Sequence, residues 1–131
     1  MLYMFLLLKD PDLEVPADVG EQHGAVEGPT RASGAYICSE ALAGAKYART
    51  VRARNRKAMV TDGPFAETKE VLGGFYIIDC KDLDGALGYA ARIPDAQFGA
   101  VEVRPLAGGP DQPWDYVAGA ANRVRQPMSS V

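Results

Sequence analysis

The sequence predicts an α+β ferredoxin-like sandwich, in which helices cover one face of an antiparallel sheet. Three observations lead to this fold class. Apolar or alternating segments typical of strands are interleaved with two segments of helical character. A β-hairpin is inserted in the middle of the chain. The length of 131 residues is that of one domain with its own core.

The first part of the chain predicts a strand, a helix and a second strand. Leu2 to Leu8 is a continuous apolar run that ends at Lys9, as in a strand buried on both faces. A helix is expected over Pro16 to Val26, with a break at Pro29, because proline lacks the amide hydrogen that continues a helix. Ala35 to Cys38 predicts a short strand, and the irregular residues after it predict a loop.

The centre of the chain predicts the inserted hairpin. Thr50 to Arg54 alternates apolar and basic residues, Lys57 to Thr61 forms the second strand, and Asn55-Arg56 forms the turn between them. Arg56 at a turn position that needs a positive φ predicts either strain or a different turn type. We interpret the basic outer face as a solvated edge, because basic side chains on an edge strand hinder pairing with other edges.

The last part predicts a strand, a helix and a final strand, which complete the sandwich. Gly73 to Cys80 predicts a strand, and Asp82 is expected to cap the helix that follows. Gly99 to Pro105 alternates as a strand does. One apolar face is expected on the helix, which Pro94 ends; its members are Leu83, Ala86, Leu87, Ala90 and Ala91.

The domain is expected to span residues 1–106. Residues 107–131 are expected to form a linker and a short C-terminal helix over Trp114 to Arg125, packed on the domain or on a second copy.

Composition narrows the classes of function. The net charge is −3 and the basic residues are spread along the chain, which argues against a nucleic-acid partner. Cys38 and Cys80 lie in separate apolar runs, so we expect free thiols, no metal site and no disulfide. No apolar segment has the length of a membrane span, and Met1 to Asp10 lacks the features of a signal peptide. A cytoplasmic protein is therefore expected.

The segment TDGPFAETKE (Thr61 to Glu70) carries a family resemblance. Together with the GGFY, LD-x-AL and EVRP segments after it, it resembles the DGPF branch of the YCII-related family. The resemblance is specific over Thr50 to Pro105 and weaker before it. It implies a ferredoxin-like fold that forms a homodimer, often as a dimeric α+β barrel, with no cofactor. Relatives with an assigned reaction are muconolactone-type enzymes, including a chloromuconolactone dehalogenase.

The resemblance also implies a catalytic pair. His23 in EQHG and Asp10 in LKDP stand where the YciI branch has a histidine that faces an aspartate. A carboxylate beside an imidazole fixes its tautomer, which suits a general acid or base. Catalytic roles are therefore expected for His23 and Asp10.

Two roles are open for the DGPF segment. In the structural role, Asp62 bonds the backbone ahead of it in an Asx-turn, and Gly63 and Pro64 shape the chain. In the functional role, polar and aromatic side chains surround a substrate cleft: Arg52, Asp62, Phe65, Glu67, Lys69 and Glu70.

Two classes of function are also open. The first is a cofactor-free enzyme in which His23 and Asp10 transfer a proton on a small lactone or enolisable organic acid. The second is a non-catalytic dimer that binds or senses a small ligand. A homodimer is expected in both, because the helices would leave one face of the sheet uncovered.

Overall fold

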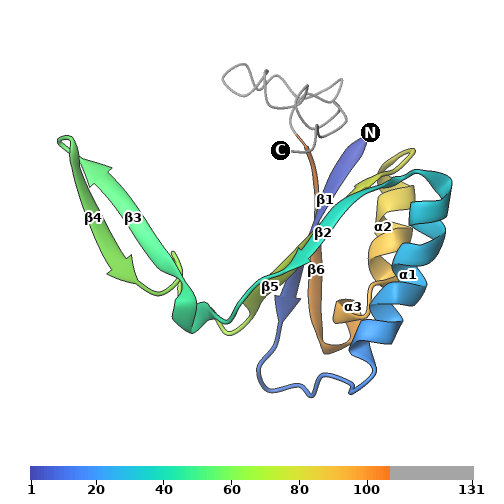
Figure 1. Ribbon diagram of the computed structural model, residues 1–131, viewed down its shortest axis with the longest axis horizontal. Coiled ribbons are helices and arrows are strands. Elements are labelled where there is room, and N and C mark those ends of the chain that lie inside the picture. The colour runs from blue at the N-terminus through green and yellow to red at the C-terminus, as the bar shows by residue number, and fades with distance from the viewer. Residues whose placement is uncertain (107–131) are drawn as a thin grey trace.

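The computed structural model describes residues 1–106, and the predicted linker and terminal helix lie outside this range (Figure 1). Four antiparallel strands form the central sheet in the order β2-β5-β1-β6. These strands are β1 (Leu2–Lys9), β2 (Tyr36–Ala41), β5 (Val71–Asp79) and β6 (Gly99–Pro105). This order, with a helix after β1 and another after β5, is that of a ferredoxin-like sandwich and confirms the predicted fold class.

The remaining elements form a helical layer and a projecting hairpin. Helices α1 (Val19–Ser33), α2 (Leu83–Arg92) and the short α3 (Asp95–Phe98) lie on one face of the sheet (Figure 1). Strands β3 (Arg49–Arg54) and β4 (Lys57–Asp62) form a separate two-stranded sheet. A 3-10 turn at Ala45–Tyr47 precedes β3.

The core lies between the sheet and α2. Alternation in β1 directs Phe5 and its neighbours two positions away towards the helices, where Phe5 packs edge-on against Tyr89 with ring centroids 5.4 Å apart. The intervening residues Met4, Leu6 and Leu8 are only partly buried. The sequence predicts that β1 is buried on both faces. Among the described residues, only the face of β1 that points towards the helices is fully buried. The core cluster comprises Tyr3, Phe5, Leu7, Tyr76, Ile78, Ala86, Tyr89, Ala90 and Ile93.

Helix α1 does not break at the proline, so this prediction is wrong. The helix continues through Pro29 and ends at Gly34, whose φ is 81°. The amides of Gly34 and Ala35 donate to the carbonyls of Arg31 and Thr30, which is a Schellman motif. The Thr30 hydroxyl lies 3.0 Å from the hydroxyl of Tyr89 in α2. This tertiary contact and the cap hold the last turns, and they outweigh the missing proline hydrogen bond.

Helix α2 begins as predicted and buries only part of the predicted apolar face. The Asp82 carboxylate accepts from the Gly85 amide at 2.8 Å, which confirms the N-cap. Leu83 and Leu87 are 52% and 49% exposed. The predicted Ala86 and Ala90 are buried, and Tyr89 is buried beside them, because the two alanines allow close approach and the aromatic ring of the tyrosine fills the core.

The hairpin and β2 are both present as predicted, but the conformation of the turn and the length of β2 needed the structure to define them. Asn55 and Arg56 have φ values of 51° and 64°, so both turn residues adopt the positive φ of a type I′ turn. Strand β2 extends to Ala41 and includes residues predicted to be loop. The corner after the hairpin follows Gly63, whose φ is 95°.

Two further features are the state of the cysteines and the length of the helices. Cys38 and Cys80 are free and partly buried, and burial raises the pKa of both thiols. Across residues 1–106, the helices are too short or too polar to cross a bilayer.

Candidate functional site

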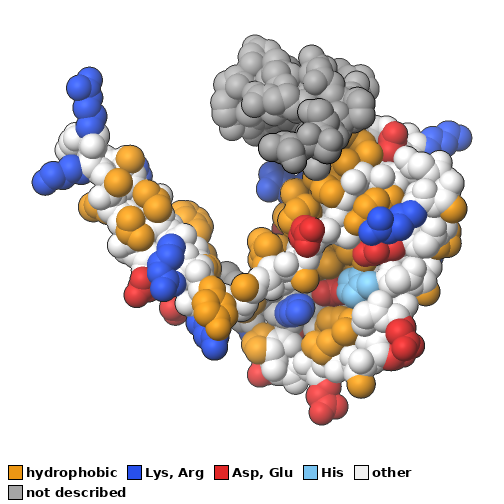
Figure 2. All heavy atoms as spheres, in the orientation of Figure 1, with side chains coloured by type: hydrophobic (Ala, Val, Ile, Leu, Met, Phe, Trp, Pro, Cys, Tyr) orange, Lys and Arg blue, Asp and Glu red, His pale blue; other side chains and the backbone are white. Residues whose placement is uncertain are grey.

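The single histidine of the chain joins three elements of the fold. His23 lies on α1, and its Nδ1 is 2.5 Å from the hydroxyl oxygen of Tyr76 on β5. Its Nε2 is 2.9 Å from Oδ1 of Asp95 on α3. The imidazole is 23% exposed, and Figure 2 shows it at the surface of the helix-covered body. We call these three residues the His23 site.

Local structure accounts for the position of each group. Alternation in β5 directs Tyr76 and Ile78 towards the helices, since both belong to the core. Pro94 ends the extended link after α2 and begins the turn that carries Asp95. Gly99 then brings α3 against β1: a Cβ at Gly99 would lie 1.8 Å from the Leu8 carbonyl oxygen. Only glycine allows this approach, so Gly99 helps to set the position of Asp95.

Asp95 is a buried carboxylate with unusual surroundings. Its side chain is 3% exposed. Although Oδ1 lies close to His23 Nε2, no donor among the described residues reaches this oxygen with hydrogen-bond geometry. The contact between His23 and Asp95 is therefore one of close approach between the imidazole and the carboxylate, without a well-aligned hydrogen bond. A buried carboxylate is costly unless a cation or donors offset its charge, and His23 is the group placed to do so.

Tyr76 supplies a hydroxyl that stays protonated. Burial raises the pKa of Tyr76, and the nearby Glu27 carboxylate raises this pKa further. The hydroxyl can donate to Nδ1 of a neutral imidazole, or accept from Nδ1–H of the other tautomer or of the cation. Tyr76 can therefore follow a change of protonation on His23 without moving.

A cavity of about 290 Å³ adjoins the His23 site. Its wall includes all three residues of the site together with Lys9, Glu27 and Ser39. Glu27 accepts a hydrogen bond from the Ser39 hydroxyl at 3.2 Å. The cavity thus places charged and polar side chains beside an imidazole edge, where they are able to orient a small polar ligand.

Two adjacent glycines shape the floor of this cavity. A Cβ at Gly73 would lie 2.7 Å from Cε of Lys9, so the lysine stem rests against the glycine. A Cβ at Gly74 would lie 2.8 Å from the carbonyl oxygen of Glu40, so β2 approaches β5 closely there. These close approaches explain why the GGFY segment carries two glycines at this site.

The predicted partner of the histidine is replaced by another aspartate. The Asp10 side chain accepts from the Asp12 amide at 2.9 Å and lies 3.8 Å from Nζ of Lys69. It thus stabilises the turn after β1, while Asp95 contacts His23.

The DGPF segment lies away from the His23 site. Phe65, Glu67 and Glu70 line a second cavity of about 760 Å³ with apolar residues such as Leu8 and Leu72. Leu8 belongs to the partly exposed set of β1, whereas the histidine lies on the helix-covered side. The structure therefore does not bring these predicted substrate-binding residues together with His23.

The other predicted binding residues make surface contacts. Asp62 Oδ1 lies 3.1 Å from Nε of Arg49. Lys69 faces the turn after β1, and the guanidinium of Arg52 lies 5.3 Å from the ring centroid of Phe65. The expected Asx-turn is replaced by a hydrogen bond from the Thr50 hydroxyl to the Gly63 carbonyl, at 2.8 Å.

Sequence reasoning missed Tyr76 and Asp95 as functional candidates. Tyr76 stands in the predicted strand, and its alternation with Ile78 could have placed it on the helix-covered face. Asp95 follows a proline in a segment too short for a periodic signal. No cluster of metal-ligating side chains occurs in the described part of the chain.

Comparisons with known proteins identify the family. The family model of the YCII-related domain matches residues 1–110. This chain belongs to the YCII-related family. An uncharacterized protein, R00369 of Rhizobium meliloti (strain 1021), is 53% identical over 62 residues, which are 46% of this chain and 50% of that protein. The match thus spans half the length of this relative.

A solved structure was also matched. It is the 5-chloro-2-hydroxyhydroquinone dehydrochlorinase of Burkholderia phenoliruptrix AC1100 in complex with 2,5-dihydroxybenzoquinone. The TM-score is 0.44 and the identity 16%, over 86% of this chain and 99% of that one.

Proposed function

We propose that this YCII-related protein is a small cofactor-free enzyme that transfers a proton on a small lactone or enolisable organic acid, with His23 as the acid–base group. The observation that carries the proposal is the His23 site itself. A partly exposed imidazole is held between a protonated phenol and a buried carboxylate, at the wall of a cavity. A positioned general base of this kind contributes about 10²–10⁴-fold to a proton transfer.

The neutral imidazole of His23 acts as the base in the first step. A ring nitrogen takes a proton from a carbon next to the substrate carbonyl: the C–H bond breaks, the N–H bond forms, and the electron pair moves into the enolate. The Asp95 carboxylate stabilises the imidazolium that results.

The second step returns the proton. The imidazolium of His23 donates this proton to another atom of the enolate or to the leaving oxygen of a lactone: the N–H bond breaks as the new C–H or O–H bond forms. His23 is then neutral again, and no electron acceptor is needed. Lys9, at the edge of the same cavity, provides positive charge near the developing oxyanion.

The second candidate function, a non-catalytic ligand-binding protein, is favoured by one observation. Both ring nitrogens of His23 already contact protein side chains. A histidine used in this way can serve to hold α1 against β5 and α3. The two candidates differ in whether a bound ligand exchanges protons with the protein.

Deuterium exchange separates them. A panel of small lactones and enolisable acids in D₂O is followed by proton NMR with wild type and His23→Gln. The enzyme proposal expects wild type to catalyse loss of the signal of the proton next to the carbonyl, and the variant to lose this activity. Binding without exchange in wild type would support the second candidate and contradict the first.

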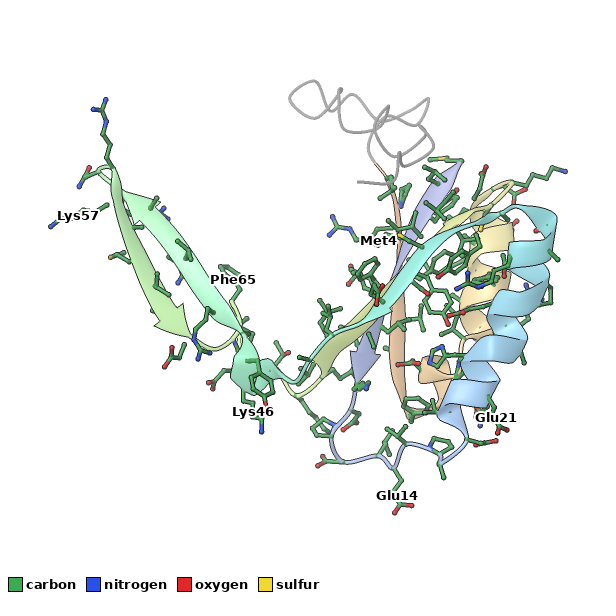
Figure 3. The ribbon with its side chains drawn as sticks, in the orientation of Figure 1. Met4, Glu14, Glu21, Lys46, Lys57 and Phe65 are labelled. Carbon is green, nitrogen blue, oxygen red and sulfur yellow. The ribbon has the colours of Figure 1, made fainter. Side chains whose placement is uncertain are left out.

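We also propose that the chain forms a homodimer through the open face of its sheet. The register places Met4 beside Ile77 and Leu6 beside Phe75, and all four side chains are partly exposed (Figure 3 labels Met4). Sedimentation equilibrium should show twice the chain mass of 14.0 kDa, and Leu6→Glu should shift the chain to monomer. A wild-type monomer at high concentration would contradict the dimer.

A further inference from the structure

The β3–β4 hairpin (residues 49–62), here called the arm, stands apart from the body of the protein. Within residues 1–106 its strands pair only with each other, and the arm projects away from the sheet (Figure 1). Lys57 lies at its tip and Phe65 near its base (Figure 3). Along both strands, every residue except Thr50 is exposed. An isolated two-stranded hairpin is only marginally stable in water, so an arm of this kind gains from a partner surface.

The two faces of the arm differ in chemistry. The register pairs Val51 with Val60, and Ala53 with Ala58, so one face is apolar beyond the Arg49–Asp62 pair at the base of the arm. The valines are 62% and 63% exposed. The opposite face carries the Arg52–Met59 pair and, nearer the tip, two further basic residues that pair with each other. Figure 2 shows apolar side chains along the arm and basic side chains at its tip.

Charge is separated between the arm and the body. The arm contains five basic residues and one acidic residue, a net charge of +4. The remaining described residues, 1–48 and 63–106, contain seven basic and fourteen acidic residues, a net charge of −7. Opposite charges on two surfaces steer their association and favour one orientation. The basic arm is thus electrostatically complementary to the acidic body of another copy.

We propose that the arm docks in trans on the body of a second copy of this chain. The inference goes beyond the catalytic proposal and rests on the proposed homodimer. Each strand of the arm is about 20 Å long and leads away from its own body. A twofold axis makes the exchange reciprocal, so each copy both gives an arm and receives one. Docking covers the face that carries the exposed valines, and the basic side chains of the arm supply the electrostatic attraction to the acidic body.

Limited proteolysis with trypsin tests the docking directly, because the arm contains five trypsin sites in an exposed hairpin. The full chain is digested at protein concentrations below and above the dimer dissociation constant, and the first cut is located by intact mass. Cleavage in the arm should slow by about tenfold or more in the dimer. An arm that is cut at the same rate in monomer and dimer overturns the proposal. Protection by added DNA but not by self-association also overturns it.

Charge reversal provides the second measurement. Arg52→Glu with Arg54→Glu should weaken the dimer about tenfold and reduce its salt dependence. Lys81→Glu, which makes the same kind of change on the body, should leave the dissociation constant within about twofold. A double variant that dimerises as wild type does overturns the arm proposal alone. A chain that is monomeric at every concentration overturns both the dimer and the arm, whereas deuterium exchange at the His23 site tests the enzyme separately.

Discussion

The body and the arm place similar side chains in opposite environments. In the body, Phe5 and Ile78 are 0% and 1% exposed, and packing around them also buries the carboxylate of Asp95. In the arm, Val51 and Val60 are exposed on a hairpin that pairs with no other strand among residues 1–106. The comparison separates two tasks. A catalytic site is expected in the body, where the core encloses polar groups. A binding surface is expected on the arm, where apolar and charged side chains are exposed.

The largest effect is expected at the glycine that brings α3 against β1. Gly99→Ala would place a Cβ 1.8 Å from the Leu8 carbonyl oxygen, so the backbone must move. We expect a loss of about 4 kcal/mol or more in the free energy of unfolding, or failure to fold. Gly28→Ala in α1, where nothing lies within 4 Å, should stabilise the protein by about 1 kcal/mol. Urea unfolding with equal losses in the two variants would contradict the close approach.

Truncation of apolar side chains tests the contrast in packing. Phe5→Ala removes a fully buried ring and should cost about 3–5 kcal/mol. Val60→Ala on the arm should change the stability of the monomer by about 0.5 kcal/mol or less. Chemical denaturation at concentrations below the dimer dissociation constant measures both. A large loss for Val60→Ala in the monomer would show that the arm packs on its own body.

Alkaline pH tests the burial of the Tyr76 hydroxyl. Burial raises the pKa of Tyr76 above its ordinary value of 10.0, so in strong alkali the unfolded state releases this proton first. The stabilisation is present below about pH 10 and is lost as pH rises, at about 1.4 kcal/mol per pH unit. Tyr76→Phe should reduce this slope. Part of the slope should remain, because burial also raises the pKa of Tyr89. Equal slopes in urea unfolding would contradict the raised pKa.

The smallest effect is expected at the aspartate of the DGPF segment. Asp62 is 90% exposed, and among the described residues its carboxylate forms an ion pair with Arg49. Asp62→Ala should therefore cost less than about 0.5 kcal/mol, as for an exposed ion pair. Thr50→Val removes the hydrogen bond to the Gly63 carbonyl and should cost more, about 1 kcal/mol. If thermal unfolding ranks the two variants in the reverse order, the Asp62 side chain has the structural role of an Asx-turn after all.

Local patterns in the sequence predicted the strands better than the helices. Alternation and apolar runs located β1, β5 and β6, and the Asn55-Arg56 turn located the hairpin, because these signals depend on near neighbours. The course of α1 through Pro29 depends on Thr30 and Tyr89, which are 59 residues apart in sequence. The buried face of α2 likewise depends on which residues fit against the sheet.

The same reasoning explains the candidate site. His23 was located because the chain has a single histidine in a family-like context. Its carboxylate partner was assigned to Asp10, whereas the contact in the structure is with Asp95. Asp10 accepts a hydrogen bond within the turn after β1, which a local pattern does not reveal, and the close packing of Gly99 on β1 helps to bring Asp95 to the site. Contacts between distant segments therefore decided the site.

NMR of the single imidazole most directly tests the pairing of His23 with Asp95. Its ¹⁵N shifts report which ring nitrogens carry protons, in wild type and in two matched variants, Asp95→Asn and Asp10→Asn. The structure predicts that Asp95→Asn changes the Nε2 shift and that Asp10→Asn leaves both ring nitrogens as in wild type. A response to Asp10→Asn with none to Asp95→Asn would contradict the site.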